Sequence, residues 1–166
     1  MDESFFFFDS LVRKKVWTKK NSRPLAIITG SHKHSCLFGA ISLGGKQIFR
    51  QYDYFDEKAF YDFLQQQIHH KFPNCYLFLD KAPQHYKSQK VREYFEKHKD
   101  VLVPVWLSTA SPEFMVLEEY WNISKNDLLV MKYYRSFTDF KMTIMEYFRT
   151  KHFNLNMKNY LLRNVS

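Results

Sequence analysis

Residues 75–80 read Cys-Tyr-Leu-Phe-Leu-Asp, a continuously apolar segment that is followed at once by the carboxylate of Asp80. A run of this kind is typical of a central strand that is covered on both faces, as in sheets whose strands are joined by crossover helices. The segment therefore predicts an α/β fold, in which the chain on either side supplies the other strands and the covering helices.

Strand and helix patterns alternate outward from this segment. Gly44-Gly45 predicts a tight hairpin, and Asp56 and Ser88 each precede a helical pattern that they can cap. The basic stretch 14–23 is a further candidate for a strand and turn. The predicted strands are Glu3–Phe8, Ser35–Leu43, Gln47–Tyr52, Cys75–Leu79 and Val101–Trp106, and the predicted helices are Asp56–Phe72, Ser88–His98, Val116–Ser124 and Thr138–Lys151.

This order of elements restricts the topology. Three early antiparallel strands followed by strands that alternate with helices predict one mixed sheet. We therefore expect a ribonuclease H-like fold: a mixed five-stranded sheet (three antiparallel strands, then parallel strands) with helices on both faces. Fold alone does not determine the chemistry.

Length and composition exclude several classes of protein. The 166 residues fit a single domain, and no apolar run approaches the roughly 20 residues of a membrane span. Met1 leads directly into Asp2 and Glu3, which is unlike a secretory signal, so we expect neither a membrane nor an exported protein. Cys36 and Cys75 are expected to be buried free thiols in a reducing cytoplasm.

The net charge favours a polyanionic partner. Twenty-five Lys and Arg against 17 Asp and Glu give +8, as in many nucleic-acid-binding proteins. The bias of an A/T-rich genome toward Lys would produce the same excess, so charge alone does not decide the question.

Carboxylates occupy three informative places. Asp2 opens the first predicted strand, Asp80 ends the most apolar one, and Glu118 and Glu119 begin a late helix. Converging carboxylates can hold two Mg²⁺ or Mn²⁺ ions ~3.5–4 Å apart for an in-line phosphoryl displacement. Each acid also has an ordinary explanation: a terminal residue, a strand-end turn, or charges that complement a helix dipole.

Two strings carry a family resemblance. Leu79-Asp80-Lys81-Ala82-Pro83-Gln84-His85 resembles the Asp-Asn-Ala-x-x-His signature of the DDE transposases in the mariner-like insertion-sequence superfamily. The segment 107–125, with Ser111-Pro112, Glu118, Trp121 and Lys125, is similar to that group's Ser-Pro…Glu-x-x-Trp-x-x-x-Lys string. The register selects Glu118 over Glu119. The start of the chain also resembles the family's first catalytic strand.

The resemblance implies a catalytic site and its cofactors. Asp2, Asp80 and Glu118 would be the catalytic and metal-binding residues, holding two Mg²⁺ (or Mn²⁺) ions that support cleavage and rejoining of DNA. Asp9 is a weaker alternative for the first position. Residues 1–166 would form a single DDE catalytic domain, apparently without the family's N-terminal helix-turn-helix region.

It also implies partners and a location. The expected partners are DNA, as transposon ends and target, with a homodimer and a separate DNA-binding region or protein left open. The expected location is the cytoplasm of a prokaryote, in association with the nucleoid. Residues expected to contact DNA are Arg13, Lys14, Lys15, Trp17, Lys19, Lys20, Lys81 and His85.

Departures from the family pattern leave two alternatives open. Lys81 replaces the Asn that follows the second Asp, and Met115 and Val116 replace the Asn-Pro pair before the Glu. One alternative is an inactive or fragmentary transposase remnant that retains DNA binding or oligomerisation. The other is a different ribonuclease H-like nuclease.

Overall fold

The computed structural model describes residues 1–11, 17–108 and 116–154. None of its helices is both long and apolar enough to cross a membrane. In chain order the elements are β1 (Asp2–Phe7), β2 (His34–Ile41), β3 (Gln47–Tyr52), α1 (Glu57–Phe63), the π-helix η1 (Leu64–His69), β4 (Cys75–Leu79), α2 (Pro83–Tyr86), α3 (Gln89–Lys97), β5 (Leu102–Trp106), α4 (Leu117–Leu129) and α5 (Phe137–Thr150). All five predicted strands are confirmed, each within two residues of its predicted bounds.

The strands form two hydrogen-bonded ladders. β1, β2 and β3 pair antiparallel in that order, and β4 pairs parallel with β5. The main-chain nitrogen of Met1 donates to the carbonyl oxygen of Phe78 at 3.0 Å, which brings the start of β1 to β4. The predicted ribonuclease H-like arrangement, three antiparallel strands and then parallel ones, is thus confirmed.

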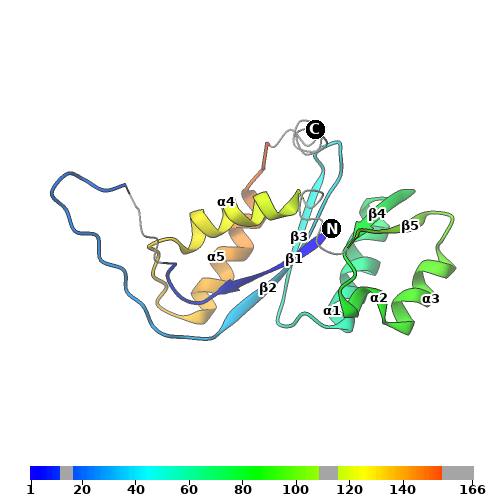
Figure 1. The fold of residues 1–166 in the computed structure, drawn as a ribbon, viewed down its shortest axis with the longest axis horizontal. Coiled ribbons are helices and arrows are strands. Elements are labelled where there is room, and N and C mark those ends of the chain that lie inside the picture. The colour runs from blue at the N-terminus through cyan, green and yellow to red at the C-terminus, as the bar shows by residue number, and fades with distance from the viewer. Residues whose placement is uncertain (12–16, 109–115, 155–166) are drawn as a thin grey trace.

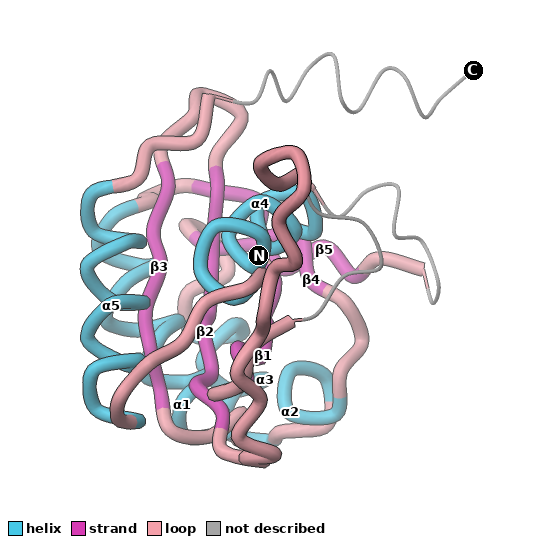
Figure 2. The backbone as a smooth tube through the Cα atoms, turned by 90° about the vertical axis from the view of Figure 1, so that its left-hand side faces the viewer, coloured by secondary structure: helices cyan, strands magenta, loops and turns pink. Residues whose placement is uncertain are grey.

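Helices cover both faces of the sheet. Alternate residues of β2 point to opposite sides, and those on each side are buried in a core of their own. Phe38 packs in one core with α1, η1 and α3, whereas Leu37 packs in a second core with α4 and α5. Figure 1 shows α1–α3 grouped around β4 and β5, and α4 with α5 beside β1 and β2. In Figure 2, α5 lies along β3.

Side-chain caps account for the start of three of the helices, α1, α3 and α5. The side chains of Asp56, Ser88 and Ser136 accept hydrogen bonds from main-chain N–H groups three residues later, as helix N-caps do. The helix predicted over 56–72 is instead α1 followed by the π-helix η1. The predicted hairpin is confirmed: the N–H of Gly45 donates to the carbonyl oxygen of Ser42, and Gly45 has a φ of +81°.

The strand predicted within 14–23 is wrong where the structure describes these residues, whereas the predicted turn is confirmed: the N–H of Ser22 donates to the carbonyl oxygen of Lys19 at 3.0 Å. Residues 17–33 contain no strand, and Trp17 is fully exposed. Figure 1 shows this long connection between β1 and β2 extending away from the sheet. Residues 12–16, which include Arg13, Lys14 and Lys15, lie outside the described residues. Both thiols are free, and Cys36 is buried as predicted, whereas Cys75 is only half-buried.

Candidate active site

Asp80 follows the last residue of β4, where the chain leaves the sheet. Its Oδ1 accepts hydrogen bonds from the main-chain N–H of Ala82 at 3.1 Å and from Nδ1 of His85 at 2.8 Å. The bond from His85 is the main reason that the pKa of Asp80 lies below its ordinary value, against the effect of partial burial. Asp80 is therefore an ionised carboxylate at neutral pH, held by one of its two oxygens.

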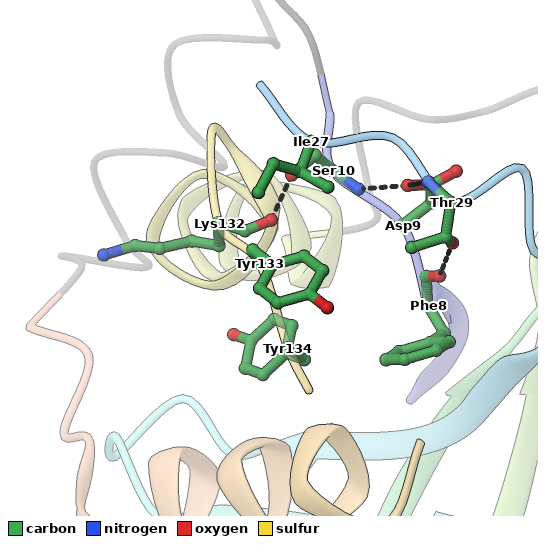
Figure 3. A pocket seen from close by; sticks show the side chains of 8 residues that line it. All are labelled: Phe8, Asp9, Ser10, Ile27, Thr29, Lys132, Tyr133 and Tyr134. Atoms are coloured by element: carbon green, nitrogen blue, oxygen red, sulfur yellow. Dashed lines mark hydrogen bonds between the residues drawn. The ribbon is translucent and has the colours of Figure 1, made fainter. Parts of the chain in front are cut away.

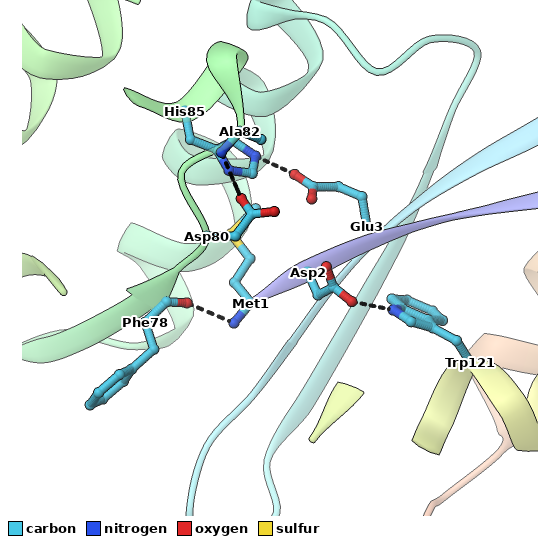
Figure 4. Close-up of polar contacts among 8 residues, drawn as sticks. All are labelled: Met1, Asp2, Glu3, Phe78, Asp80, Ala82, His85 and Trp121. Carbon is cyan, nitrogen blue, oxygen red and sulfur yellow. Dashed lines mark hydrogen bonds and ion pairs between the residues drawn. The ribbon is translucent and has the colours of Figure 1, made fainter. Parts of the chain in front are cut away.

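His85 lies buried between two acids. It projects from the short helix α2, and its Nε2 contacts Oε1 of Glu3 while its Nδ1 contacts Asp80 (Figure 4). Burial by itself lowers the pKa of His85, but the hydrogen bonds and charges of Asp80 and Glu3 outweigh it and raise the pKa to about 9. The side chain is only 1% exposed, so it offers DNA no accessible surface in this structure, in contrast to the sequence-based expectation.

The alternation of β1 separates Asp2 from Glu3. Asp2 pairs with Gly39 and Glu3 with Phe38, so the two side chains point to opposite faces of the sheet. Glu3 points toward α2, and Asp2 points toward α4, where Nε1 of Trp121 donates to its Oδ2 at 2.9 Å. Burial first, and the charge of Glu3 second, raise the pKa of Asp2 to about 6 against the opposing effect of the Trp121 hydrogen bond.

Gly39 makes the position of Trp121 possible. A Cβ at residue 39 would lie 2.8 Å from Cη2 of the Trp121 indole and 2.9 Å from Cε1 of Phe49. The indole therefore lies directly on the main chain of β2, in the row that pairs Asp2 with Gly39. A glycine on a central strand thus allows the tryptophan to reach Asp2.

The helix α4 presents Glu118, Trp121 and Lys125 along one stripe, because these positions are three and four residues apart. Glu118 is exposed in the first turn, whereas Trp121 is buried. Lys125 is half-buried with its Nζ 5.6 Å from the centroid of the Phe6 ring, and burial lowers its pKa although the charge of Asp2 opposes this.

Within the described part of the chain, one group of three side chains offers ligand atoms that all lie within 4.8 Å of one another: Glu3, Asp80 and His85. Asp80 alone belongs both to this group and to the triad expected from the sequence. Asp2 is next in sequence to Glu3, a member of this group. Glu118 lies one helical turn before Trp121, whose indole donates to Asp2. Glu3, which directly follows Asp2, was not predicted from the sequence; its place on the same strand end was the available signal.

Asp9 has a structural role at the far end of β1 (Figure 3). Its carboxylate accepts hydrogen bonds of 2.9 Å from the main-chain N–H groups of Ser10, Thr29 and Gly30. These bonds, that of Thr29 foremost, hold the pKa of Asp9 below its ordinary value. The adjacent hollow of about 10 Å³ has room for about one water molecule. Asp9 therefore fastens the long β1–β2 connection at its return to the sheet.

The remaining residues expected to contact DNA lie on the surface where the structure describes them. Trp17, Lys19 and Lys20 are exposed on the β1–β2 connection, and Lys81 is exposed beside Asp80. Nothing in the structure joins the first three to the carboxylate group, whereas Lys81 follows Asp80 directly.

Solved structures of a transposase in several complexes have a similar fold. A Mos1 transposase paired-end complex with left transposon end matches 90% of this chain and 47% of its own at 18% identity, with a TM-score of 0.65. The Mos1 strand transfer complex matches 98% of this chain and 50% of its own at 17% identity, with a TM-score of 0.67. The chain spans about half the length of these structures, and at this identity the likeness establishes the fold.

A search of curated proteins gave no match. A family model described as DDE superfamily endonuclease matches residues 1–141, a range that contains Asp2, Asp80 and Glu118. Because this match covers most of the chain and every element through the start of α5, the chain belongs to the DDE superfamily of endonucleases.

Proposed function

We propose that this chain is the catalytic domain of a transposase, which cuts DNA at transposon ends and joins them to a target with two divalent metal ions. Asp2, Asp80 and Glu118 would hold Mg²⁺ or Mn²⁺, and Glu3 would supply a further carboxylate at the same strand ends. The observation that carries the proposal is the approach of Glu3, Asp80 and His85 to within 4.8 Å where β1 meets β4.

The carboxylates fit hard divalent cations in chemistry and in charge. Carboxylate oxygens are the ligands that Mg²⁺ prefers. The raised pKa of Asp2 reflects burial beside the charge of Glu3, a cost that a cation would remove. The protein donors engage Oδ2 of Asp2 and Oδ1 of Asp80, so the second oxygen of each is the one expected to face a cation.

Bound divalent ions would supply activation of water or a 3′ hydroxyl and stabilisation of the charge that develops on the phosphate. The residues of the chain would prepare that site. Trp121 orients Asp2 from α4, and protonated His85 orients Asp80 and Glu3 from α2. Lys81, which is exposed and follows Asp80 directly, would contact a phosphate of the DNA.

A plasmid-nicking assay with Mn²⁺ tests the catalytic part of the proposal. Wild type should nick supercoiled plasmid, and Asp80→Ala should lower the rate by several orders of magnitude because the central carboxylate is lost. Lys87→Ala, an exposed residue just after α2, serves as a control that should retain activity. Equal activity of wild type and Asp80→Ala, or none in either, would contradict the proposal and favour the inactive remnant.

Strand transfer needs a separate assay. Wild type supplied with a pre-cut oligonucleotide of the transposon end should join it to a target plasmid. Hydrolysis without any joining would instead favour a ribonuclease H-like nuclease of another kind.

A further inference from the structure

A second hollow lies between η1 and α3, on elements that carry none of the proposed catalytic carboxylates. Its volume is about 480 Å³, and its walls include Tyr61, His69, Lys90, Tyr94, Lys97 and His98. Five of the nine lining residues are Lys or His, and a single one, Glu93, is acidic. Lys90 and Lys97 supply the positive charge of this concave surface, which suits an anionic ligand, whereas burial and the neighbouring histidines lower the pKa of His69.

Tyr94 organises the imidazoles of the wall. Its hydroxyl lies 2.5 Å from Nδ1 of His69, and its carbonyl oxygen accepts from Nδ1 of His98 at 2.8 Å. The rings of His69 and His98 meet edge to face with centroids 4.6 Å apart. Because Tyr94 is itself buried, the two imidazoles are held in a fixed arrangement.

The lysines of the hollow are not neutralised by carboxylates. In the part of the chain that the structure describes, neither Lys90 nor Lys97 takes part in an ion pair. Nζ of Lys90 lies 3.9 Å from the centroid of the Tyr61 ring, a cation–π contact that holds the ammonium group in the hollow without neutralising its charge. The carboxylate of Glu93 accepts a hydrogen bond of 2.8 Å from the side-chain amide of Gln89, and it forms no ion pair with Lys90 or Lys97 in the described part of the chain.

The spacing of the lysines distinguishes a polymer from a small anion. Lys90 and Lys97 are seven residues apart on α3 and so lie on one face, about 10 Å apart along the helix axis. This axial spacing favours a row of phosphates, which extends along an axis, over a single phosphate ion. A strand of B-DNA carries a phosphate about every 3.4 Å of rise, so about three of its phosphates span the same length.

We propose that this hollow, which we call the α3 groove, is a second DNA-backbone contact that binds phosphates without reading sequence. The inference rests on DNA being the substrate in the proposed function. The groove would hold DNA outside the catalytic site, with Lys90 and Lys97 as its two phosphate contacts.

The test is the salt dependence of DNA binding, measured by fluorescence anisotropy with a labelled duplex oligonucleotide in EDTA. The double substitution Lys90→Gln/Lys97→Gln should weaken binding and lower the slope of log K against log [KCl] by about 2, since each lost phosphate contact removes about 0.9. Lys90→Arg/Lys97→Arg should keep the wild-type slope, because it retains both charges.

Lys58→Gln/Lys132→Gln is the matched control, because both residues are exposed, lie outside the groove and remove the same charge. The α3 groove is refuted if the slope for Lys90→Gln/Lys97→Gln equals that of wild type or of this control. Binding in EDTA involves no cleavage, so the slope is measured independently of the catalytic step. A wild type that binds with this slope and fails to nick would contradict the proposed function alone.

Discussion

Nε1 of the Trp121 indole donates a hydrogen bond of 2.9 Å to Oδ2 of Asp2, across 119 positions of sequence. The bond joins α4 to the strand that carries the first acid of the proposed triad. Because Glu118 lies one turn before Trp121, the same helix sets the side from which the last acid approaches. Trp121 therefore couples the two ends of the site.

Replacing Trp121 by Phe should raise the pKa of Asp2. The substitution keeps an aromatic ring over Gly39 and removes the donor that favours the ionised carboxylate. A hydrogen bond to a charged group contributes about 1.5–3 kcal/mol, so the pKa should rise above its value of about 6 by roughly one to two pH units. Carboxyl-carbon NMR titration in metal-free buffer measures it.

Trp106→Phe is the control for this titration, because Trp106 packs against Tyr86 and Phe95 on β5. It should leave the pKa of Asp2 unchanged. An unchanged Asp2 pKa in Trp121→Phe as well would show that the indole only fills space.

Replacing Gly39 by Ala should destabilise the fold through Trp121. The new Cβ would lie 2.8 Å from Cη2 of the indole and 2.9 Å from Phe49. Overpacking of this kind costs about 1–3 kcal/mol, which urea unfolding measures as a lower free energy of unfolding. Gly44→Ala is the matched control, since the nearest atom to its Cβ beyond the adjacent residues, Oγ of Ser42, is 3.8 Å away.

A double substitution tests whether Trp121 is the cause. Phe lacks the outer ring atoms that approach residue 39, so Gly39→Ala combined with Trp121→Phe should be destabilised by less than the sum of the single effects. Strict additivity would point to strain elsewhere in the strand.

The pKa of His85 predicts a pH dependence of stability. Its value rises from 6.5 to about 9 on folding, so the stabilisation is fully present below pH 6.5 and is lost as the pH rises through 9. The size is of the order of 3 kcal/mol. Urea unfolding in EDTA should therefore give a lower free energy of unfolding at pH 9.5 than at pH 6.5.

His85→Gln supplies the comparison. It should be destabilised at pH 6.5, because Glu3 and Asp80 lose the cation between them, and it should lack most of the decline toward pH 9.5. A decline as steep in the variant as in wild type would assign the effect to another group.

Local patterns were enough to predict the strands and two of the helix caps, but not the closure of the site. Continuous apolar residues at 75–79 and the capping side chains of Asp56 and Ser88 act within a few residues, so sequence reports them directly. The burial of His85 depends instead on Glu3, 82 positions away. A pairing at that range leaves no local periodicity, and the histidine therefore resembled a surface residue.

The strand predicted in the connection after β1 was wrong for a related reason. Lys and aromatic residues around Trp17 resemble a hairpin, yet Trp17 is fully exposed and no strand pairs there in residues 17–33. What orders the return of this loop is the carboxylate of Asp9, which binds the N–H groups of Thr29 and Gly30. A contact of this kind between a side chain and a distant main chain leaves no periodic pattern in the sequence, so it could not be predicted.

Substitutions of Asp2 and Asp9 should have different effects, because Asp2 is proposed to bind metal and Asp9 holds the β1–β2 connection. Asp2→Asn removes a carboxylate charge from the proposed metal site, so Mn²⁺-dependent plasmid nicking should fall by orders of magnitude while the fold is kept. Asp9→Ala removes only the loop contacts, so nicking should stay within a few-fold of wild type. Hydrogen exchange at Thr29 and Gly30 should accelerate in Asp9→Ala and stay unchanged in Asp2→Asn. Loss of nicking in Asp9→Ala with full activity in Asp2→Asn would transfer the first catalytic position to Asp9.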